Sequence, residues 1–222
     1  CSLLENVVFS SQSSLTSIGM FAFLGCSSLT SINIPNSVNE IGMAAFQDCI
    51  SLTSINIPNE VTKLDWASFE NCSSLVSVTI PDAVTSIGAS SFRNCILLEE
   101  VSISPQSALT SIGASAFSGC SSLISINVPD GVTSIGNEAF CNCTSLANVA
   151  ISPQSALVSI GVGAFYSCSS LSYVNIPDGV TEIGNGTFAS CSSLTSITIP
   201  DGVTSIAEWA FTACHSLADI TI

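Results

Sequence analysis

Ten cysteines recur along this chain at intervals of 23 or 25 residues, and this regularity limits the possible folds more than any other feature of the sequence. The cysteines stand at positions 1, 26, 49, 72, 95, 120, 143, 168, 191 and 214. Internal repeats of about 20 to 45 residues are typical of solenoids, in which each unit contacts mainly its neighbours. We therefore expect residues 1–222 to form a single repeat domain of about nine and a half units.

The chain begins at Cys1 and ends at Ile222, and both residues fall inside a unit. Solenoids usually carry atypical segments at their ends, because an open end exposes apolar side chains. We expect the chain to be a fragment of a longer array that lacks both caps.

Within one unit, the spacing of apolar residues predicts a strand. In the unit that starts at Cys120, Ile126 and Val128 alternate with Ser125 and Asn127. This period of two is typical of a half-buried strand. Stacked units would pair such strands in parallel.

The rest of the unit predicts turns and a second extended piece. Pro129-Asp130-Gly131 has turn composition, with the glycine free to adopt a positive φ. A short extended segment follows at residues 132–135, and residues 137–142 have room for one helical or 3₁₀ turn at most. One phenylalanine per unit predicts a stacked column of Phe23, Phe46, Phe69, Phe92, Phe117, Phe140, Phe165, Phe188 and Phe211.

The repeated pattern L-x-x-I-x-I-P-x-x-V-x-x-I-G-x-x-A-F-x-x-C resembles the BspA-type class of leucine-rich repeats over essentially the whole chain. One unit carries it at Leu29, Ile32, Ile34, Pro35, Val38, Ile41, Gly42, Ala45, Phe46 and Cys49. The resemblance implies a β-dominated leucine-rich-repeat horseshoe, with a parallel sheet on its concave face and second short strands and short helical or 3₁₀ turns on its convex side. It also implies an extracellular or cell-surface protein that adheres to other proteins or to cells.

The charge balance excludes several partners. Sixteen acidic residues oppose only Lys63 and Arg93, which gives a formal net charge of -14. Nucleic acids and anionic membrane surfaces need clustered cations, so neither is expected as a partner. Polar residues interrupt every apolar run before the length of a membrane span, so we expect no membrane insertion of this segment.

The cysteine ladder allows three interpretations. Stacked rungs would bring cysteine Cα atoms to about 5 Å, nominally within disulfide range, but parallel side chains keep their Cβ atoms too far apart. Metal-ligand spacing of the C-x₂-C kind is missing. We expect buried free thiols, no metal and no cofactor, with Cys141, which lies off the ladder, as the one accessible thiol.

The sequence offers no set of catalytic groups. A hydrolase or transferase needs a base beside its nucleophile, and the only histidine, His215, occupies a position where serine is usual. We do not expect an enzyme.

Residues that depart from the consensus are the candidates for partner binding. The outward strand positions carry mostly serine and asparagine, whereas specificity needs groups that differ between units. The candidates on the concave face are Glu99, Glu100, Tyr173, Asn127 and Asn175. Three longer turns, at residues 10–15, 104–109 and 152–157, add two residues each to one edge of the stack.

These observations favour a non-catalytic recognition or adhesion module that binds a protein or glycan through the concave sheet or the loop edge. A structural spacer within a longer surface protein is the alternative, because most of the outward residues are monotonous. Ice or mineral binding by the regular polar rows is a more remote alternative.

Overall fold

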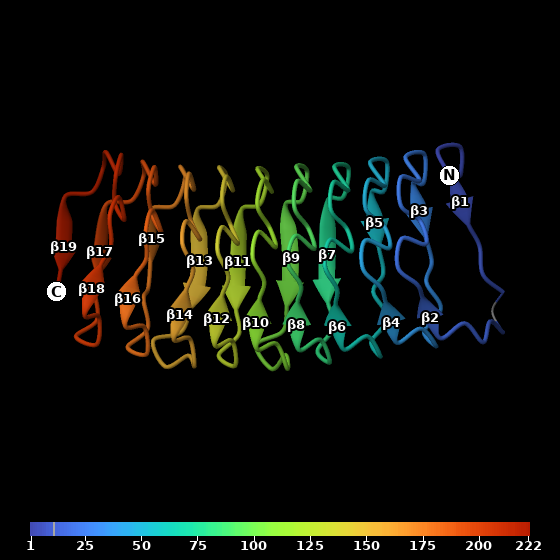
Figure 1. The fold of residues 1–222 in the computed structure, drawn as a ribbon, viewed down its shortest axis with the longest axis horizontal. Helices are drawn as coiled ribbons and strands as arrows, with labels where there is room; N and C mark the ends of the chain where they lie inside the picture. The colour runs from blue at the N-terminus through green and yellow to red at the C-terminus, as the bar shows by residue number, and fades with distance from the viewer. Residues whose placement is uncertain (11) are drawn as a thin grey trace.

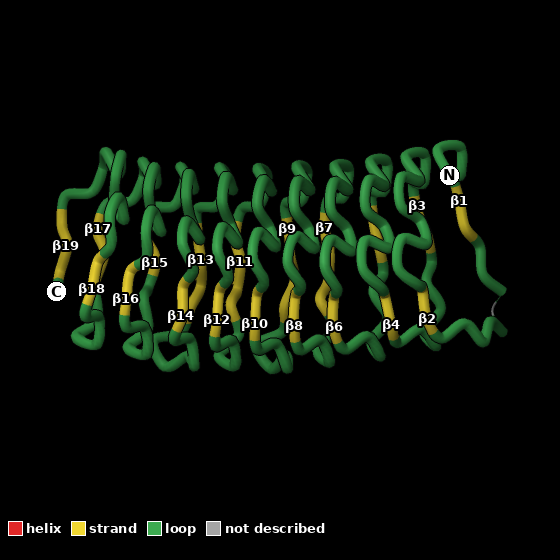
Figure 2. Tube along the Cα trace, in the orientation of Figure 1, coloured by secondary structure: helices red, strands yellow, loops and turns green. Residues whose placement is uncertain are grey.

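The computed structural model describes residues 1–10 and 12–222 and consists of stacked turns of chain, which we call rungs (Figure 1). The rungs follow one another in chain order along the long axis of the molecule. Figure 2 shows that loops and turns make up most of each rung, and the strands are two to four residues long. The expected β-dominated repeat solenoid is confirmed.

The odd-numbered strands form the side of the stack that we call the sheet face. Each pairs in parallel with the strand one rung away, so that Ser125 lies opposite Asn148 and Ile126 opposite Val149. Eight strands form one sheet in rung order, and β17 and β19 pair beyond it. The bounds are β1 (Asn6–Val7), β3 (Ser31–Ile32), β5 (Ser54–Ile55), β7 (Ser77–Ile80), β9 (Glu100–Ile103), β11 (Ser125–Val128), β13 (Asn148–Ile151), β15 (Tyr173–Val174), β17 (Ser196–Thr198) and β19 (Asp219–Thr221).

The even-numbered strands are two residues long and form a second, interrupted set of parallel pairs. Five of them, β6 to β14, make a continuous sheet, while β2 pairs with β4 and β16 with β18. Their bounds are β2 (Ser17–Ile18), β4 (Glu40–Ile41), β6 (Lys63–Leu64), β8 (Ser86–Ile87), β10 (Ser111–Ile112), β12 (Ser134–Ile135), β14 (Ser159–Ile160), β16 (Glu182–Ile183) and β18 (Ser205–Ile206).

The core is a set of apolar columns that run along the stack. Phenylalanine rings of successive rungs stack with centroids 5.2 to 5.7 Å apart and planes within 11° of parallel. The predicted column of nine is therefore confirmed. In the rung that starts at Cys120, the inward residues are all at most 2% exposed: Leu123, Ile126, Val128, Val132, Ile135, Ala139, Phe140 and Cys143.

The segment after each even-numbered strand forms consecutive turns, where the sequence predicted a short helical turn. Two residues of each such segment have a positive φ, for example Ala44 at 50° and Asp48 at 60°. Alternate N–H groups then point along the stack: those of Ala44, Phe46 and Asp48 donate at 2.8 Å to carbonyls of the next rung. Because these N–H groups already form hydrogen bonds between rungs, they are not available for the hydrogen bonds of a helix. We call the side formed by these segments the turn face.

The glycines of this unit are not needed for a positive φ, although the sequence suggested that role for Gly131. The turn after β11 is closed by the Val132 N–H, which donates to the Pro129 carbonyl at 3.0 Å, but Gly131 is not among the residues with positive φ. A Cβ at Gly136 would lie 2.5 Å from the backbone nitrogen of Ala114. Close approach between rungs, rather than backbone twist, therefore requires glycine at position 136.

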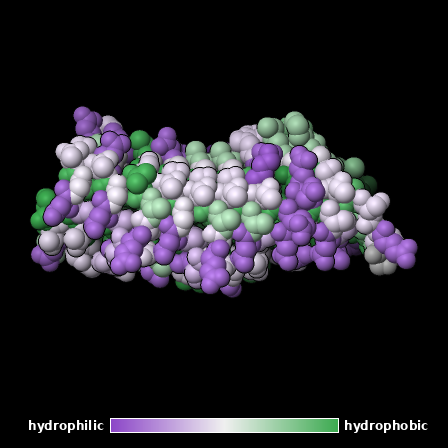
Figure 3. Space-filling model, turned by 90° about the horizontal axis from the view of Figure 1, so that it is seen from below, coloured by the Kyte–Doolittle hydropathy of each residue, from purple (hydrophilic) through white to green (hydrophobic). Residues whose placement is uncertain are grey.

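Figure 3 views the stack along the edge where odd-numbered strands pass into even-numbered ones. Hydrophilic and near-neutral residues dominate this edge, and hydrophobic residues appear in separate patches. The longer turns at 104–109 and 152–157 lie on it. The corresponding turn at 10–15 includes Ser11, which lies outside the described residues.

Candidate functional site

Two of the predicted residues, Glu99 and Glu100, lie side by side at the start of β9. Glu100 is exposed on the sheet face and pairs in register with Ser77 and Ser125. Glu99 precedes the strand between two exposed apolar residues, Val76 and Ile124, which are 42% and 55% exposed. Backbone hydrogen bonds hold Glu99 beside these neighbours, since the Glu99 N–H donates to the Val76 carbonyl at 2.8 Å.

A hollow of about 400 Å³ lies on the sheet face beside Glu100. Its polar lining includes Asn127 and Asp82, so the structure brings together the predicted residues Glu100 and Asn127 and a second carboxylate, from the turn after β7. Ser102 Oγ donates to Glu100 Oε1 at 2.9 Å, which orients one oxygen of that carboxylate. Neither Lys63 nor Arg93 lines the hollow, so it favours a cationic group.

Tyr173 and Asn175 form a separate position on the same face. Tyr173 is 52% exposed and lies opposite Asn148. Three rungs separate it from Glu100, which corresponds to about 15 Å at the usual strand spacing. The Asn175 Nδ2 donates to the Ile151 carbonyl at 3.4 Å, so this amide is partly used within the fold. The five predicted residues therefore divide into two groups.

Exposed apolar side chains gather at the edge of the sheet face near Glu99. Ile96 and Leu97 are 46% and 48% exposed and precede β9, close in sequence to Glu99. Together with Val76 and Ile124 they span three consecutive rungs. Exposed hydrophobic residues grouped beside charged ones are typical of protein interaction sites.

The cysteine ladder is structural. All eleven cysteines are free, and Cys26, Cys49, Cys72, Cys95, Cys120, Cys143, Cys168 and Cys191 are buried. From Cys49 to Cys214, each ladder thiol donates through Sγ to the phenylalanine carbonyl one rung earlier, at 3.0 to 3.2 Å. The thiol thus satisfies a carbonyl of the core, a role that no sequence pattern revealed.

The expectation that Cys141 alone would be accessible is wrong. Cys1 is exposed and Cys214 is partly exposed, because each has a neighbouring rung on one side only, and Cys141 itself is only partly exposed. Burial raises the pKa of Cys49 to about 12 and that of Cys95 well above its usual value. Such thiols carry almost no nucleophilic thiolate at neutral pH.

Catalytic and metal-binding groups do not converge in the described residues. His215 is exposed in the last rung and directly follows Cys214, and burial raises the pKa of the Cys214 thiol. Within residues 1–10 and 12–222, no three His, Cys, Asp or Glu side chains are placed to hold a metal ion. The same residues include no apolar helix of membrane-spanning length.

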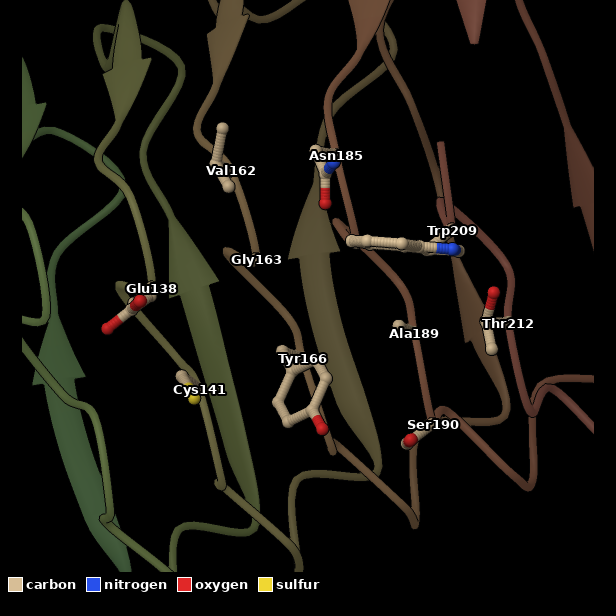
Figure 4. Close-up of a pocket in the computed structure, with 11 residues that line it drawn as sticks. Glu138, Cys141, Val162, Gly163, Tyr166, Asn185, Ala189, Ser190, Trp209 and Thr212 are labelled. Atoms are coloured by element: carbon tan, nitrogen blue, oxygen red, sulfur yellow. The ribbon is translucent and has the colours of Figure 1, made fainter. Parts of the chain in front are cut away.

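A second hollow lies on the turn face, and sequence reasoning found only part of it. It has a volume of about 520 Å³ and is bordered by Trp209, Tyr166 and Glu138 (Figure 4). Of its lining residues, the sequence singled out Cys141 as the thiol off the ladder but not Tyr166, because the residue at the position of Tyr166 differs in every unit. Alignment of the turn segments by column would have shown the neighbouring glycines that open this hollow.

Comparison with known proteins places this geometry in a family. The model of the BspA type leucine rich repeat region, in six copies, matches residues 1–123 and 110–222. No curated protein sequence matches the chain significantly. The chain is similar to several solved bacterial structures.

A leucine-rich repeat protein of Bacteroides ovatus is 30% identical with a TM-score of 0.74, over 99% of this chain and 63% of that one. The leucine rich repeat protein of T. pallidum is 31% identical with a TM-score of 0.68, over 75% of this chain and 77% of that one. A leucine rich cell surface protein of Faecalibacterium prausnitzii is 27% identical with a TM-score of 0.57, over 93% and 76%. This chain thus spans less than two thirds of the B. ovatus protein. Because the family model matches essentially the whole length of the chain, the chain belongs to the BspA-type leucine-rich repeat family.

Proposed function

We propose that residues 1–222 form one repeat domain that acts as a non-catalytic recognition or adhesion module and binds a protein partner through the sheet face. The observation that carries this proposal is the hollow of about 400 Å³ that contains Asp82, Glu100 and Asn127. In this hollow the carboxylate of Glu100 stands where the neighbouring rungs have Ser77 and Ser125, and the carboxylate of Asp82 adds a second negative charge. A lysine or arginine side chain of the partner would fit there.

The surroundings of the hollow support a protein over a glycan at this site. Glu99 directly precedes Glu100 in the chain and lies between the exposed apolar residues Val76 and Ile124 of the neighbouring rungs. Interfaces between proteins combine an apolar centre with charged groups that fix orientation. The family resemblance to a leucine rich cell surface protein supports an extracellular or surface location for this contact.

The test is to measure binding of the chain to extracellular-matrix proteins, to cells and to a glycan array, and then to repeat it with Glu100→Ser and Asp82→Asn. We expect each substitution to weaken binding to a basic protein partner at least tenfold, and added salt to weaken it further. Glu182→Ser, which removes an exposed carboxylate of the same charge from β16, is the matched control and should bind as the parent does.

Tyr173→Ser distinguishes the two groups of predicted residues. If Tyr173 belongs to the same interface as Glu100, this substitution weakens binding as well, and if it does not, the partner covers only the acidic hollow. Undiminished binding in both Glu100→Ser and Asp82→Asn would refute the site. Failure to bind any partner would favour the structural spacer.

A further inference from the structure

One column of the turn face has the same unusual backbone in every complete rung. Each of its residues has a positive φ, between 50° and 61°. Any residue with a Cβ is disfavoured in this left-handed region, whereas glycine adopts it freely. The column reads Phe21, Ala44, Ala67, Ser90, Ser115, Glu138, Gly163, Gly186 and Trp209.

The two glycines of this column create the hollow of about 520 Å³. At Gly163 and Gly186 no side chain projects, whereas Glu138 and Trp209 project from the rungs on either side. Figure 4 shows Glu138 and Cys141 at one side of the hollow and Trp209 at the other, with Gly163 and Tyr166 between them. The hollow thus has a backbone floor across two rungs and a side-chain wall at each end.

The wall formed by Trp209 is an exposed indole in a strained backbone position. Trp209 is 66% exposed, because no described turn segment follows the one to which it belongs, and its φ is 58°. Tyr166, on the floor side of the hollow, is 43% exposed. Exposed aromatic rings at a hollow supply flat apolar surface to a ligand.

The polar groups of the hollow define the charge of its ligand. Asn185, Ser190 and Thr212 offer an amide and two hydroxyls, and Glu138 is the one charged residue of its lining. The cations Lys63 and Arg93 do not line it and are paired elsewhere, with Asp65 at 3.1 Å and Glu70 at 3.3 Å. An anionic ligand would therefore meet only a carboxylate in a chain of net charge -14.

The spacing of the aromatic residues leaves room for a ligand wider than a small ion. Tyr166 and Trp209 stand two rungs apart, and the phenylalanines beside them are separated by steps of 5.6 and 5.7 Å. Gly163 and Gly186 project no side chain into this space. A ring-shaped ligand would fill it better than a single small cation, which is kept as an outcome of the test below.

We propose that this hollow binds a neutral pyranose sugar, the terminal or internal residue of an uncharged glycan. One C–H face of the sugar ring packs on the Trp209 indole. Its hydroxyls exchange hydrogen bonds with the amide of Asn185, the hydroxyls of Ser190 and Thr212 and the carboxylate of Glu138. The site lies on the turn face and is independent of the protein-binding hollow on the sheet face.

The first test uses the intrinsic fluorescence of Trp209 in a Trp66→Phe background, where it is the only tryptophan. Methyl glycosides of glucose, galactose, mannose and N-acetylglucosamine are titrated in, and the chain is applied to an array of neutral glycans. We expect a saturable fluorescence change with at least one sugar. Trp209→Ala should abolish array binding, while Trp66→Ala, which removes a 42% exposed tryptophan of another rung, should leave it unchanged.

A second variant closes the hollow without removing any polar or aromatic group. Gly186→Asn places a side chain over the floor, and asparagine tolerates the left-handed backbone. Its Cβ would lie 3.9 Å from the Cβ of Ala189, which is an ordinary contact. We expect at least a tenfold loss of sugar binding with an unchanged circular dichroism spectrum and melting temperature.

Three results would overturn the proposal. The first is the absence of saturable binding by every neutral sugar tested. The second is binding that survives both Trp209→Ala and Gly186→Asn. The third is a response to tetramethylammonium but to no sugar, which would identify a cation site. Glu100→Ser should not change sugar binding, so failure of this site and failure of the sheet-face site are distinguishable.

Discussion

Rungs in the middle of the stack and the rung at its C-terminal end have the same sequence pattern but differ in burial. Ile126 and Ile135 are 2% and 1% exposed, whereas Ile220 and Ile206, which occupy the same columns in the last rungs, are 46% and 45% exposed. The middle strands β7, β9, β11 and β13 have four residues each, and most others have two. An apolar column is therefore buried only where a rung has a neighbour on both sides.

The distance between rungs also differs. A Cβ at Gly136 would overlap the backbone of the previous rung, at 2.5 Å from Ala114 N. At Gly184 the nearest atom would be Thr187 Oγ1 at 3.4 Å, and Ala207 stands at the equivalent position of the next rung. Glycine is thus required at position 136 in the middle of the stack and dispensable at position 184 near its C-terminal end.

The largest expected effect is that of shortening a side chain in the phenylalanine column, which tests this comparison between the middle and the end of the stack. Phe117→Ala should lower the free energy of unfolding by about 3 to 5 kcal/mol, because the ring is fully buried between two others. Phe211→Ala, at a partly buried ring with one stacked neighbour, should lower it by roughly 1 to 2 kcal/mol. Urea denaturation measures both, and equal losses would contradict a stack stabilised by nearest neighbours.

The glycine pair gives the next largest effect. Gly136→Ala should destabilise the chain by about 1 to 3 kcal/mol, because the rungs must separate to admit the methyl group. Gly184→Ala should be neutral or stabilise by up to about 1 kcal/mol, through the lower entropy of the unfolded chain. Thermal melting of the two variants checks this, and a loss of stability at Gly184 as large as that at Gly136 would show that the spacing is uniform after all.

The cysteine ladder gives an effect that is absent at neutral pH and appears only above pH 9. Unfolded thiols lose their protons above their usual pKa of 9.0, while burial keeps Cys49 and Cys191 protonated until about pH 12. Below pH 9 both states hold the same protons, so the full stability is present there and falls as pH rises from 9 to 12.

Substitution of single ladder cysteines shows where this pH dependence arises. Cys95→Ala should make the decline shallower by about 1.4 kcal/mol per pH unit, since one proton no longer differs between the two states. Cys214→Ala should change it less, because that thiol is only partly buried. The measurement is the urea midpoint as a function of pH, and an unchanged slope in Cys95→Ala would mean that its thiol titrates normally in the folded chain.

The sequence predicted the columns of the fold because each column repeats. Phe117 and Cys120 recur in every unit, so their common burial and stacking followed from the spacing alone. The backbone conformation of the turn face was not predictable in this way. Residues such as Ala44 and Glu138 adopt a left-handed backbone that their side chains disfavour, and only the hydrogen bonds to the next rung explain it.

The candidate site was predicted in part. Glu100 departs from the repeated row of serines, whereas Asn127 belongs to the repeated row of asparagines. The structure places both residues in one hollow. Asp82 was missed as a lining residue because it comes from the turn of an earlier rung. In the hollow on the turn face, Gly163 was missed because it contributes by lacking a side chain. Both contributions depend on which residues neighbouring rungs place side by side.

The turn face has an electrical direction of its own. In every rung from Phe21 to Gly186, the N–H of this column donates to a carbonyl of the next rung. Peptide dipoles aligned head to tail add together, as they do in a helix, so the turn face carries partial positive charge toward the C-terminal end of the stack. N–H groups beside the strands, such as those of Gly42, Gly88 and Gly113, donate to the previous rung instead. The two sets of dipoles oppose each other along the stack, so an anion at the last rung is favoured only close to the turn face.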